Sequence, residues 1–294
     1  MLKFIKNLSG HSGCEISLWE IDNCKYFVRK KSALTSYNIR LKKQFLKQKK
    51  YNLSIAKTPK IYSCGMENNL FFFDMEYVPC MTFCEYINSI RITELVDFIK
   101  ILFANLPIDK SCKNLAVNKI FDKKISSLMQ SITDKNSTLK QSFELLCFND
   151  WSSVVQSPSH GDLTLENILI STNHKIYLID FLDTFYSSWM VDLAKIFQDL
   201  EVKWSFRNMK PDTNRDLRLL IAKETLSEMI LLLPNGKNIL IQIYKILLLN
   251  LLRIIPYTTD EKTKNFVFTA IENTLNIIEK MEAKNENSYH SMCR

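Results

Sequence analysis

The chain has 294 residues, of which 46% are hydrophobic and 24% charged, and its formal net charge is +8. These values exclude a disordered or fibrous protein, and the length indicates two domains or one large domain. No apolar stretch near the N-terminus is long enough for a secretory signal, and polar side chains interrupt the apolar residues 239–255, so we expect a buried helix rather than a membrane span. Eight cysteines without a C-x-x-C pair and four histidines argue against a zinc site and indicate reduced thiols in the cytoplasm.

The positive charge is concentrated in one part of the chain. Residues 25–60 contain twelve Lys or Arg and no Asp or Glu. Such a segment can attract nucleic acid, an acidic surface or phosphate groups, and it can equally be a solvated helix face. Both interpretations stay open at this point.

The first part of the chain predicts a β-rich region. A glycine turn at residues 9–13 precedes two alternating runs, residues 15–20 and 25–30, which predict a β-hairpin. Residues 37–51 show helical spacing. Between Pro59 and Gly65 we expect a short strand, with Gly65 in a turn, and residues 70–77 form a strongly β-prone run.

The pattern changes to helices after residue 82. Helices are expected at residues 83–90, 93–105, 118–129, 139–148, 192–201, 212–232, 237–254 and 260–282, interrupted by strands at 167–170 and 175–181. The composition shift near Val78 sets the expected boundary between an N-terminal lobe, residues 1–78, and a C-terminal lobe, residues 79–294.

The most specific segment is H-G-D-L-T-L-E-N at residues 160–167, followed by a predicted strand that ends in I-D-F at residues 179–181. Phosphoryl transfer to an alcohol needs a carboxylate near the attacking hydroxyl and oxygen ligands that hold the magnesium bridging the phosphates. Asp162, Asn167 and Asp180 supply that set. An Asp or Asn standing alone in a turn is more often a local cap, but the joint pattern is hard to obtain by chance.

These residues resemble the catalytic loop and metal-binding strand end of the aminoglycoside phosphotransferase and choline kinase group, the small-molecule branch of the protein-kinase-like superfamily. The V-D-L-A run at residues 191–194 resembles a segment that commonly follows. The resemblance implies a bilobal α+β kinase-like fold with ATP and Mg²⁺ as cofactors. It also implies that Asp162 is the catalytic base or hydroxyl-orienting group and that Asn167 and Asp180 are magnesium ligands.

We expect supporting roles for three residues near this set. We expect His160 to hold the loop through hydrogen bonds, because a histidine base would duplicate Asp162. Asp192 is expected to buttress the loop structurally. Asp183 either reaches a second magnesium or caps the turn.

The N-terminal part agrees with that group in order and spacing. In the kinase-like fold a glycine loop between two strands covers the phosphates, and the matching segment here carries Ser9, Gly10, Ser12 and Gly13. By itself this segment would be an ordinary β-turn. The strand at residues 26–30 resembles the one with the phosphate-binding lysine, which we assign to Lys30, or to Lys31 if the strand carries a bulge.

One departure concerns the partner of that lysine. No acidic residue occurs between Asp22 and Glu67, so the usual helix Glu is missing. Gln44 or Gln48 could orient Lys30 by hydrogen bonding, without neutralising its charge. This departure leaves an inactive protein of the same fold as an alternative.

Residues 73–78 resemble the hinge between the lobes. Main-chain groups at Glu76 and Val78 would bind the adenine edge, although an ordinary strand ending at Pro79 describes the same residues. The acceptor pocket is expected in the helices beyond residue 200, where the side chains that could line it are Trp204, Arg207, Arg253 and Tyr257.

Together these features predict in-line transfer of the ATP γ-phosphoryl group to a hydroxyl of a small molecule, in the cleft between the lobes. The resemblance implies a sugar, an amino sugar or an amino alcohol as acceptor, and the basic net charge favours an anionic acceptor over a cationic one. One alternative is a protein kinase, which the missing helix Glu disfavours. The other is an inactive module that binds RNA or another anionic partner through residues 25–60, which the intact Asp162, Asn167 and Asp180 disfavour. The oligomeric state is left open.

Overall fold

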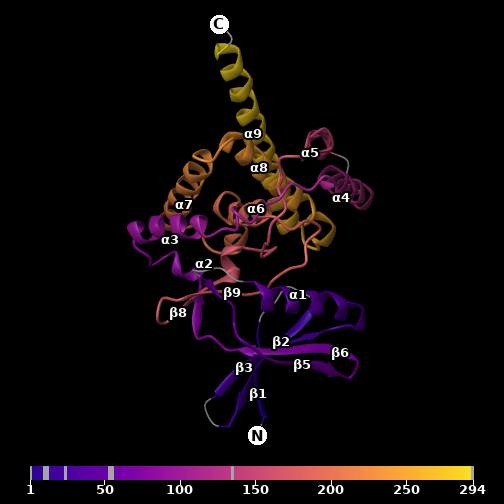
Figure 1. Ribbon diagram of the computed structural model, residues 1–294, viewed down its shortest axis with the longest axis vertical. Coiled ribbons are helices and arrows are strands. Elements are labelled where there is room, and N and C mark those ends of the chain that lie inside the picture. The colour runs from indigo at the N-terminus through magenta and orange to yellow at the C-terminus, as the bar shows by residue number, and fades with distance from the viewer. Residues whose placement is uncertain (1, 9–12, 23–24, 52–55, 134–135, 293–294) are drawn as a thin grey trace. The chain divides into compact units, whose positions relative to one another are not determined.

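The computed structural model describes residues 2–8, 13–22, 25–51, 56–133 and 136–292, with side chains as far as residue 283 (Figure 1). Its contacts divide the chain into two compact units. The first unit comprises Met1–Tyr86 and His160–Thr184, and the second comprises Ile87–Ser159 and Phe185–Arg294. The segment with the expected catalytic loop therefore folds with the N-terminal strands. The predicted boundary after residue 78 stays a prediction.

The first unit is built on a five-stranded antiparallel sheet with the strand order β1-β2-β3-β6-β5. Its strands are β1 (Leu2–Asn7), β2 (Cys14–Ile21), β3 (Lys25–Ser32), β5 (Ile61–Glu67) and β6 (Leu70–Glu76). The predicted hairpin and the β-prone run at residues 70–77 are confirmed. Strand β1 was not predicted, because this edge strand leaves its lysines and most of its apolar residues exposed.

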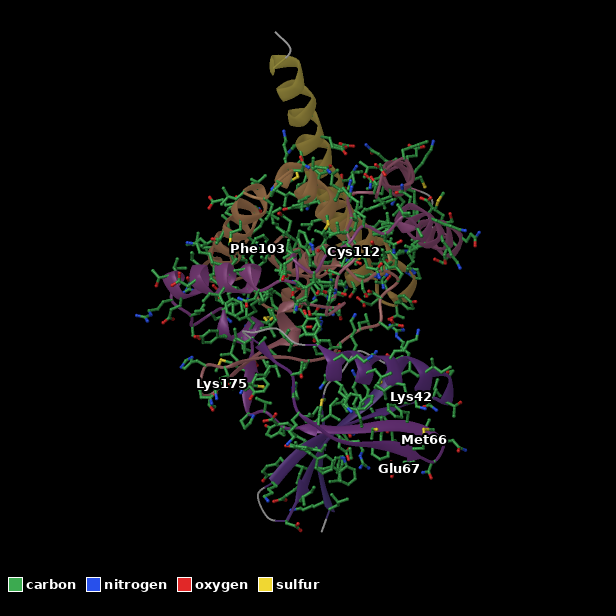
Figure 2. All side chains as sticks on the ribbon, in the orientation of Figure 1. Lys42, Met66, Glu67, Phe103, Cys112 and Lys175 are labelled. Atoms are coloured by element: carbon green, nitrogen blue, oxygen red, sulfur yellow. The ribbon has the colours of Figure 1, made fainter. Side chains whose placement is uncertain are left out.

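The prediction that Gly65 lies in a turn is wrong. Gly65 is inside β5, opposite Phe72, and a Cβ atom there would lie 3.2 Å from the Phe72 ring. The turn between β5 and β6 is formed instead by Asn68 and Asn69, which have positive φ angles of 50° and 62°. Asn tolerates this left-handed conformation better than most residues, so the Asn pair, and not the glycine, marks the turn. Figure 2 labels Met66 and Glu67 at this end of the hairpin.

Helix α1 (Asn38–Lys50) packs on one face of the sheet. Leu41 on α1 forms a buried cluster with Phe71 and Phe73 on β6, and Phe45 packs against it. Each of these buried side chains stabilises the fold by roughly 1.5–3 kcal/mol. The lysines in the last turn of α1 complement the negative end of the helix dipole. The predicted helix at residues 37–51 is confirmed.

A second, smaller sheet completes the first unit in the order β4-β9-β8-β7. Its strands are β4 (Ala56–Lys57), β7 (Cys80–Thr82), β8 (Ile168–Ser171) and β9 (Ile176–Leu178), and α2 (Phe83–Tyr86) follows β7. The strands predicted at 167–170 and 175–181 are present, but β9 ends at Leu178, so residues 179–181 lie beyond it. The two- and three-residue strands β4 and β7 are too short to leave a periodic signal.

The second unit, as far as it is described, is helical. Its helices are α3 (Ile92–Ala104), α4 (Val117–Ser131), α5 (Ser137–Cys147), α6 (Trp189–Leu200), α7 (Thr213–Leu231), α8 (Gly236–Leu252) and α9 (Glu261–Met292). Helix α8 packs against α6, α7 and α9. The predicted helices are confirmed, except that α9 continues beyond residue 282 and that α2 ends at Tyr86.

The segment Gly236–Tyr257, which contains α8, is long and apolar enough to cross a membrane by length and composition alone. Within its most apolar window, 78% of the residues are buried inside the structure. The core helix of a soluble protein has the same properties. The burial fits the prediction of a buried helix at this place.

Candidate active site

Lys30 and Asp180 form an ion pair within the first unit. The Lys30 side chain is 4% exposed, and that of Asp180 is 30% exposed. Period two along β3 turns Lys31 and Arg29 to the opposite side of the sheet. There Lys31 lies 3.2 Å from the Glu67 carboxylate, and Arg29 makes a bidentate contact with Asp74. The structure therefore brings Lys30, and not Lys31, to the predicted metal-binding strand end.

Asp180 sits where the chain leaves β9 and turns back toward the loop at residues 160–167. Its φ angle is 60°, a left-handed conformation that Asp adopts more readily than most residues. The amide of Leu182 donates to the carbonyl of His160 at 3.1 Å. Gly161, with a φ angle of 91°, makes this close approach possible, because a Cβ atom there would lie 2.2 Å from the Leu182 carbonyl oxygen.

His160 links the loop to the metal-binding strand end. It is fully buried, and its Nε2 lies 2.8 Å from the carbonyl oxygen of Ile179, which can only accept. Nε2 therefore carries the proton, and Nδ1 accepts from the amide of Asp162 at 3.3 Å. Burial lowers the pKa of His160 to about 4, so the ring is neutral at pH 7. A neutral ring with one donor and one acceptor matches the predicted structural role.

Because burial lowers the pKa of His160, the protein should lose stability in acid through this residue. The folded state resists protonation at a pH where the unfolded chain, with a pKa near 6.5, takes up a proton. The stabilising contribution is complete above about pH 6.5 and is lost as the pH falls toward 4. We expect the wild type to lose about 3 kcal/mol more unfolding free energy than His160→Gln between pH 7 and 4. Urea unfolding of both proteins at each pH measures this difference, and equal losses would contradict it.

Asp162 and Asn167 are joined through the backbone of the loop. The side-chain amide of Asn167 donates to the main-chain carbonyl of Asp162 at 2.8 Å, and the amide of Thr164 donates to the same carbonyl at 2.8 Å. The Asn167 oxygen Oδ1 receives no hydrogen bond from any residue that the structure describes. Asn167 is thus held by its nitrogen and presents its oxygen, the atom that would bind a cation.

Two lysines of α1 reach the segment that follows Asp180, and neither was predicted as a site residue. Lys47 donates to the carbonyl of Leu182 at 2.7 Å, and Lys43 lies 2.9 Å from the carboxylate of Asp183. Their spacing of four residues places them on one face of the helix, which was the available signal. Lys43 holds Asp183 in the structure, and this arrangement fits the alternative in which Asp183 stabilises the turn and does not bind a second magnesium.

The two glutamines proposed as partners of Lys30 make other contacts. Gln48 donates to the carbonyl of Pro59 at 3.2 Å, and Gln44 donates to the hydroxyl of Tyr37 at 3.1 Å. Gln44 is 2% exposed, and its oxygen Oε1 has no hydrogen-bond partner among the described residues.

The expected nucleotide contacts are described in part. Ser9, Gly10 and Ser12 lie outside the described residues, whereas Gly13 precedes β2, and its carbonyl accepts from the amide of Ala33 at 3.1 Å. Glu76 is tied to Lys60, since its amide donates to the Lys60 carbonyl and its carboxylate accepts from the Lys60 amide. Val78 belongs to a buried cluster with Leu169 and Tyr177.

The side chains suggested for the acceptor pocket do not converge in the second unit. The guanidinium of Arg207 lies 4.0 Å from the centroid of the Trp204 ring, whereas that of Arg253 lies over Phe185. Tyr257 is 83% exposed. Asp192, the expected buttress, is fully buried in the first turn of α6.

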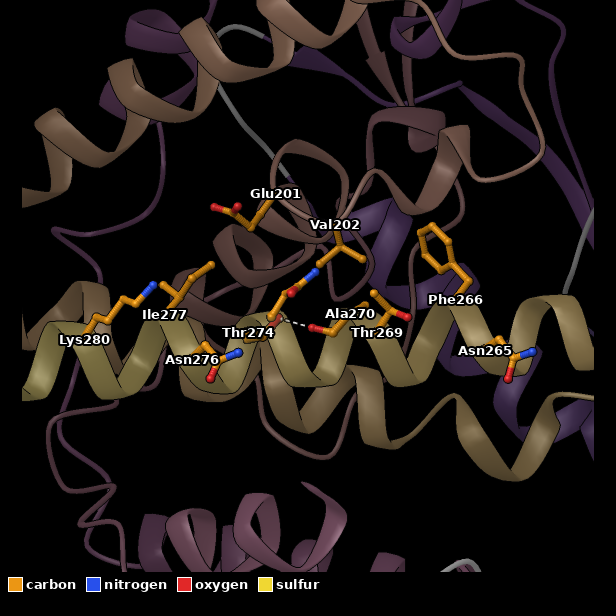
Figure 3. Close-up of a pocket in the computed structure, with 11 residues that line it drawn as sticks. Glu201, Val202, Asn265, Phe266, Thr269, Ala270, Thr274, Asn276, Ile277 and Lys280 are labelled. Atoms are coloured by element: carbon orange, nitrogen blue, oxygen red, sulfur yellow. Dashed lines mark hydrogen bonds between the residues drawn. The ribbon is translucent and has the colours of Figure 1, made fainter. Parts of the chain in front are cut away.

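A hollow of about 560 Å³ runs along α9 in the second unit, with Glu201 and Phe266 among its lining residues (Figure 3). The hydroxyl of Thr274 beside it already donates to the carbonyl of Ala270, at 2.7 Å within the same helix. None of the sequence-predicted site residues lines this hollow.

Comparison with known proteins shows which solved structures share this fold. No protein-family model and no curated protein matches the chain in sequence. A thermostable mutant of an aminoglycoside phosphotransferase, in complex with AMP-PNP and hygromycin B, matches it in structure with a TM-score of 0.62 and 11% identity, covering 96% of this chain and 94% of its own. A candidate fructosamine-3-kinase from Haemophilus somnus matches with a TM-score of 0.56 and 16% identity, covering 94% and 92%. Choline kinase from Streptococcus pneumoniae matches with a TM-score of 0.53 and 16% identity, covering 94% and 93%.

At these identities the likeness shows the fold. The predicted α+β kinase-like fold is confirmed, and the resemblance to the aminoglycoside phosphotransferase and choline kinase group holds at the level of structure.

Proposed function

We propose that this protein is an ATP- and Mg²⁺-dependent phosphotransferase that phosphorylates a hydroxyl group of a small molecule. The observation that carries the proposal is the conjunction, within the first unit, of the partly buried Lys30–Asp180 ion pair with the loop that holds Asp162 and Asn167. The likeness of the fold to small-molecule kinases supports it.

The donor set fits magnesium. Within the described residues no three His, Cys, Asp or Glu side chains converge as a metal-binding group. Mg²⁺ at phosphotransferase sites is typically held by one or two carboxylates together with substrate phosphates and water, so a full protein cage is not required. Asp180 supplies a carboxylate, and Asn167 supplies an amide oxygen without a donor among the described residues. When bound there, Mg²⁺ would neutralise charge on the β- and γ-phosphates.

The remaining steps of the phosphoryl transfer would be carried out by side chains of the site. Lys30 would bind phosphate oxygens, and Asp162 would orient the acceptor hydroxyl and take up its proton. The hydroxyl oxygen then bonds to the γ-phosphorus as the bond to the β–γ bridging oxygen breaks, and ADP leaves with that electron pair. His160, neutral at pH 7, would hold Asp162 and the metal-binding strand end together through Ile179.

The neighbours support a proposal for the acceptor class. They are an aminoglycoside phosphotransferase, a candidate fructosamine kinase and a choline kinase, whose named substrates are an amino sugar antibiotic, a sugar amine and an amino alcohol. A sugar, an amino sugar or an amino alcohol is therefore the acceptor class that we propose.

The test is ADP release from Mg·ATP in the presence of pooled sugars, amino sugars, amino alcohols and sugar phosphates. One pool should stimulate ADP release above the rate with ATP alone, and dividing that pool identifies the acceptor. If no pool stimulates release and the protein does not bind AMP-PNP in a separate titration, the proposal is wrong.

Lys30→Ala should raise the KM for ATP, or lower kcat/KM, by about 10- to 100-fold, because a hydrogen bond to a charged group contributes roughly 1.5–3 kcal/mol. Lys31→Ala is the matched control, since Lys31 pairs with Glu67 on the other side of the sheet. Its ATP kinetics should stay within threefold of wild type. A reversed result would place the phosphate contact at Lys31.

A module that binds an anionic partner is the second candidate. It is favoured by α1, which exposes Arg40, Lys42, Lys43, Lys49 and Lys50; Lys42 is labelled in Figure 2. Binding of RNA that weakens steeply with salt, in a protein without turnover, would support this candidate instead.

A further inference from the structure

One face of α1 contacts the segment that follows Asp180, and these contacts lie within the first unit. Lys43, Lys47 and Tyr51, the C-cap residue, are spaced by four positions, so their side chains lie along one side of the helix. We call these three residues the contact face of α1. In this order they meet three consecutive residues of the segment in reverse: Asp183, Leu182 and Phe181.

Lys47 makes the central contact of this face. Its Nζ donates to the carbonyl oxygen of Leu182 at 2.7 Å, and the amide of Leu182 donates to the carbonyl of His160 at 3.1 Å. A Cβ atom on Gly161 would lie 3.0 Å from the same Nζ and 2.2 Å from the Leu182 carbonyl oxygen. The Lys47 ammonium therefore lies where the loop that contains Gly161 meets the segment after Asp180.

Lys47 also differs from the other lysines of α1 in its burial. It is half-buried. The other four are exposed, namely Lys42, Lys43, Lys49 and Lys50. Withdrawing part of an ammonium from water is unfavourable unless the group gains a hydrogen bond, and a hydrogen bond from a charged group stabilises more than an exposed ion pair such as Lys43–Asp183. Of the two lysine contacts, that of Lys47 is therefore the stronger.

The ring of Tyr51 contacts the same two segments at the end of the helix. Its centroid lies 5.0 Å from that of Phe181 and 6.3 Å from that of His160, edge-on in both pairs. The rings of Phe181 and His160 also meet each other, with centroids 4.2 Å apart. Phe181 directly follows Asp180, and His160 is two residues before Asp162. The contact face of α1 therefore reaches the neighbours of both the proposed metal ligand and the proposed base.

We propose that Lys47 is a positioning residue for the phosphoryl transfer, which aligns the carboxylate of Asp162 with that of Asp180. Lys47 acts through Leu182 in this role. Its hydrogen bond fixes Leu182, two residues after Asp180, against Gly161, the residue before Asp162. A displacement of about 1 Å in an active site can lower the rate about 100-fold, so loss of this contact should lower kcat. The inference rests on the proposed function, because it adds a residue to the same site.

Lys47→Met tests the proposal, because it keeps an apolar side chain of similar length and removes the ammonium. With the acceptor identified by ADP release, kcat should fall by about 10- to 100-fold, whereas the KM for Mg·ATP should stay within threefold of wild type. Lys47→Arg, whose guanidinium can donate to the same carbonyl, should keep kcat within threefold. If Lys47→Met does not fold, Lys47→Gln takes its place, with the same loss of kcat expected.

Lys49→Met is the matched control, since it removes the same charge from an exposed position of the same helix. Its kcat should stay within twofold of wild type. If kcat of Lys47→Met falls by less than tenfold, or if Lys47→Arg loses as much kcat as Lys47→Met, Lys47 does not align the two carboxylates through Leu182. The proposed function stands in either case.

Hydrogen exchange tests the same contact without an acceptor. In Lys47→Met the amide of Leu182, which donates to the His160 carbonyl, should exchange at least tenfold faster than in the wild type, while the amides of β3 keep their wild-type rates. Lys49→Met should change neither. Unchanged exchange at Leu182 would overturn the role of Lys47, even where AMP-PNP binds normally. If the wild type binds no AMP-PNP and no acceptor stimulates it, the proposed function itself fails, and the role of Lys47 fails with it.

Discussion

Asp180→Ala is expected to lower acceptor-stimulated ADP release by at least about 10³-fold, which corresponds to roughly 4 kcal/mol of transition-state stabilisation. The substitution removes the carboxylate that would hold Mg²⁺, and it leaves the buried ammonium of Lys30 without its described partner. The nucleotide should then bind with little dependence on Mg²⁺. Steady-state kinetics and AMP-PNP titrations with and without Mg²⁺ measure both effects.

A second substitution at Asp180 separates the loss of the metal ligand from a loss of folding. Removing one partner of a buried pair can destabilise a protein strongly, so Asp180→Ala alone would be ambiguous. Asp180→Asn keeps the shape and an acceptor for Lys30, and it should show the same kinetic loss with near-normal unfolding.

Asp183→Asn is the matched control for charge, because Asp183 lies in the same segment but pairs with Lys43. We expect it to lose less than tenfold. A loss as large as that of Asp180→Asn would instead assign Asp183 as a second magnesium ligand.

Asp162→Asn should reduce acceptor-stimulated ADP release by about 10³-fold, within the range of 10²–10⁴-fold that a positioned general base contributes. The affinity for Mg·AMP-PNP should stay within threefold of wild type. The reason is structural: three hydrogen bonds that shape the loop use the main chain of Asp162, through His160, Thr164 and Asn167. The variant should therefore keep the loop while losing the carboxylate.

The rate of the Asp162→Asn variant tests whether Asp162 takes up the proton of the acceptor hydroxyl. If Asp162→Asn retains the wild-type rate with the identified acceptor, the proton of the hydroxyl does not pass to Asp162, and our assignment is wrong. A variant that also loses nucleotide binding would mean that the substitution disturbed the loop, which circular dichroism and AMP-PNP titration would reveal.

Much of the fold could be predicted because the signals are local. Alternation in β2 and β3, helical spacing in α1 and the apolar runs of α6 and α8 each lie within one short window of sequence. The predictions that failed concern residues whose conformation depends on contacts with other parts of the chain. Gly65 resembled a turn glycine, yet the turn is formed by Asn68 and Asn69, and Gly65 sits inside a strand where Phe72 needs the space.

The candidate site was predictable residue by residue, but its contacts were not. The motif at residues 160–167 identified Asp162 and Asn167 as candidates. The alternation of side chains along β3 identified Lys30. Nothing in the sequence shows that Lys47 holds the Leu182 carbonyl, since the two residues are 135 positions apart and neither belongs to a motif.

The sequence by itself determined the order of the helices and of the longer strands after β1, the loop with Asp162 and Asn167, and the absence of an acidic partner for Lys30 on α1, because each of these is encoded in neighbouring residues. Only the tertiary structure decided that Lys30 pairs with Asp180, 150 positions away, and that His160 is neutral with its proton on Nε2. These properties depend on burial and on contacts between distant segments, which local periodicity does not encode.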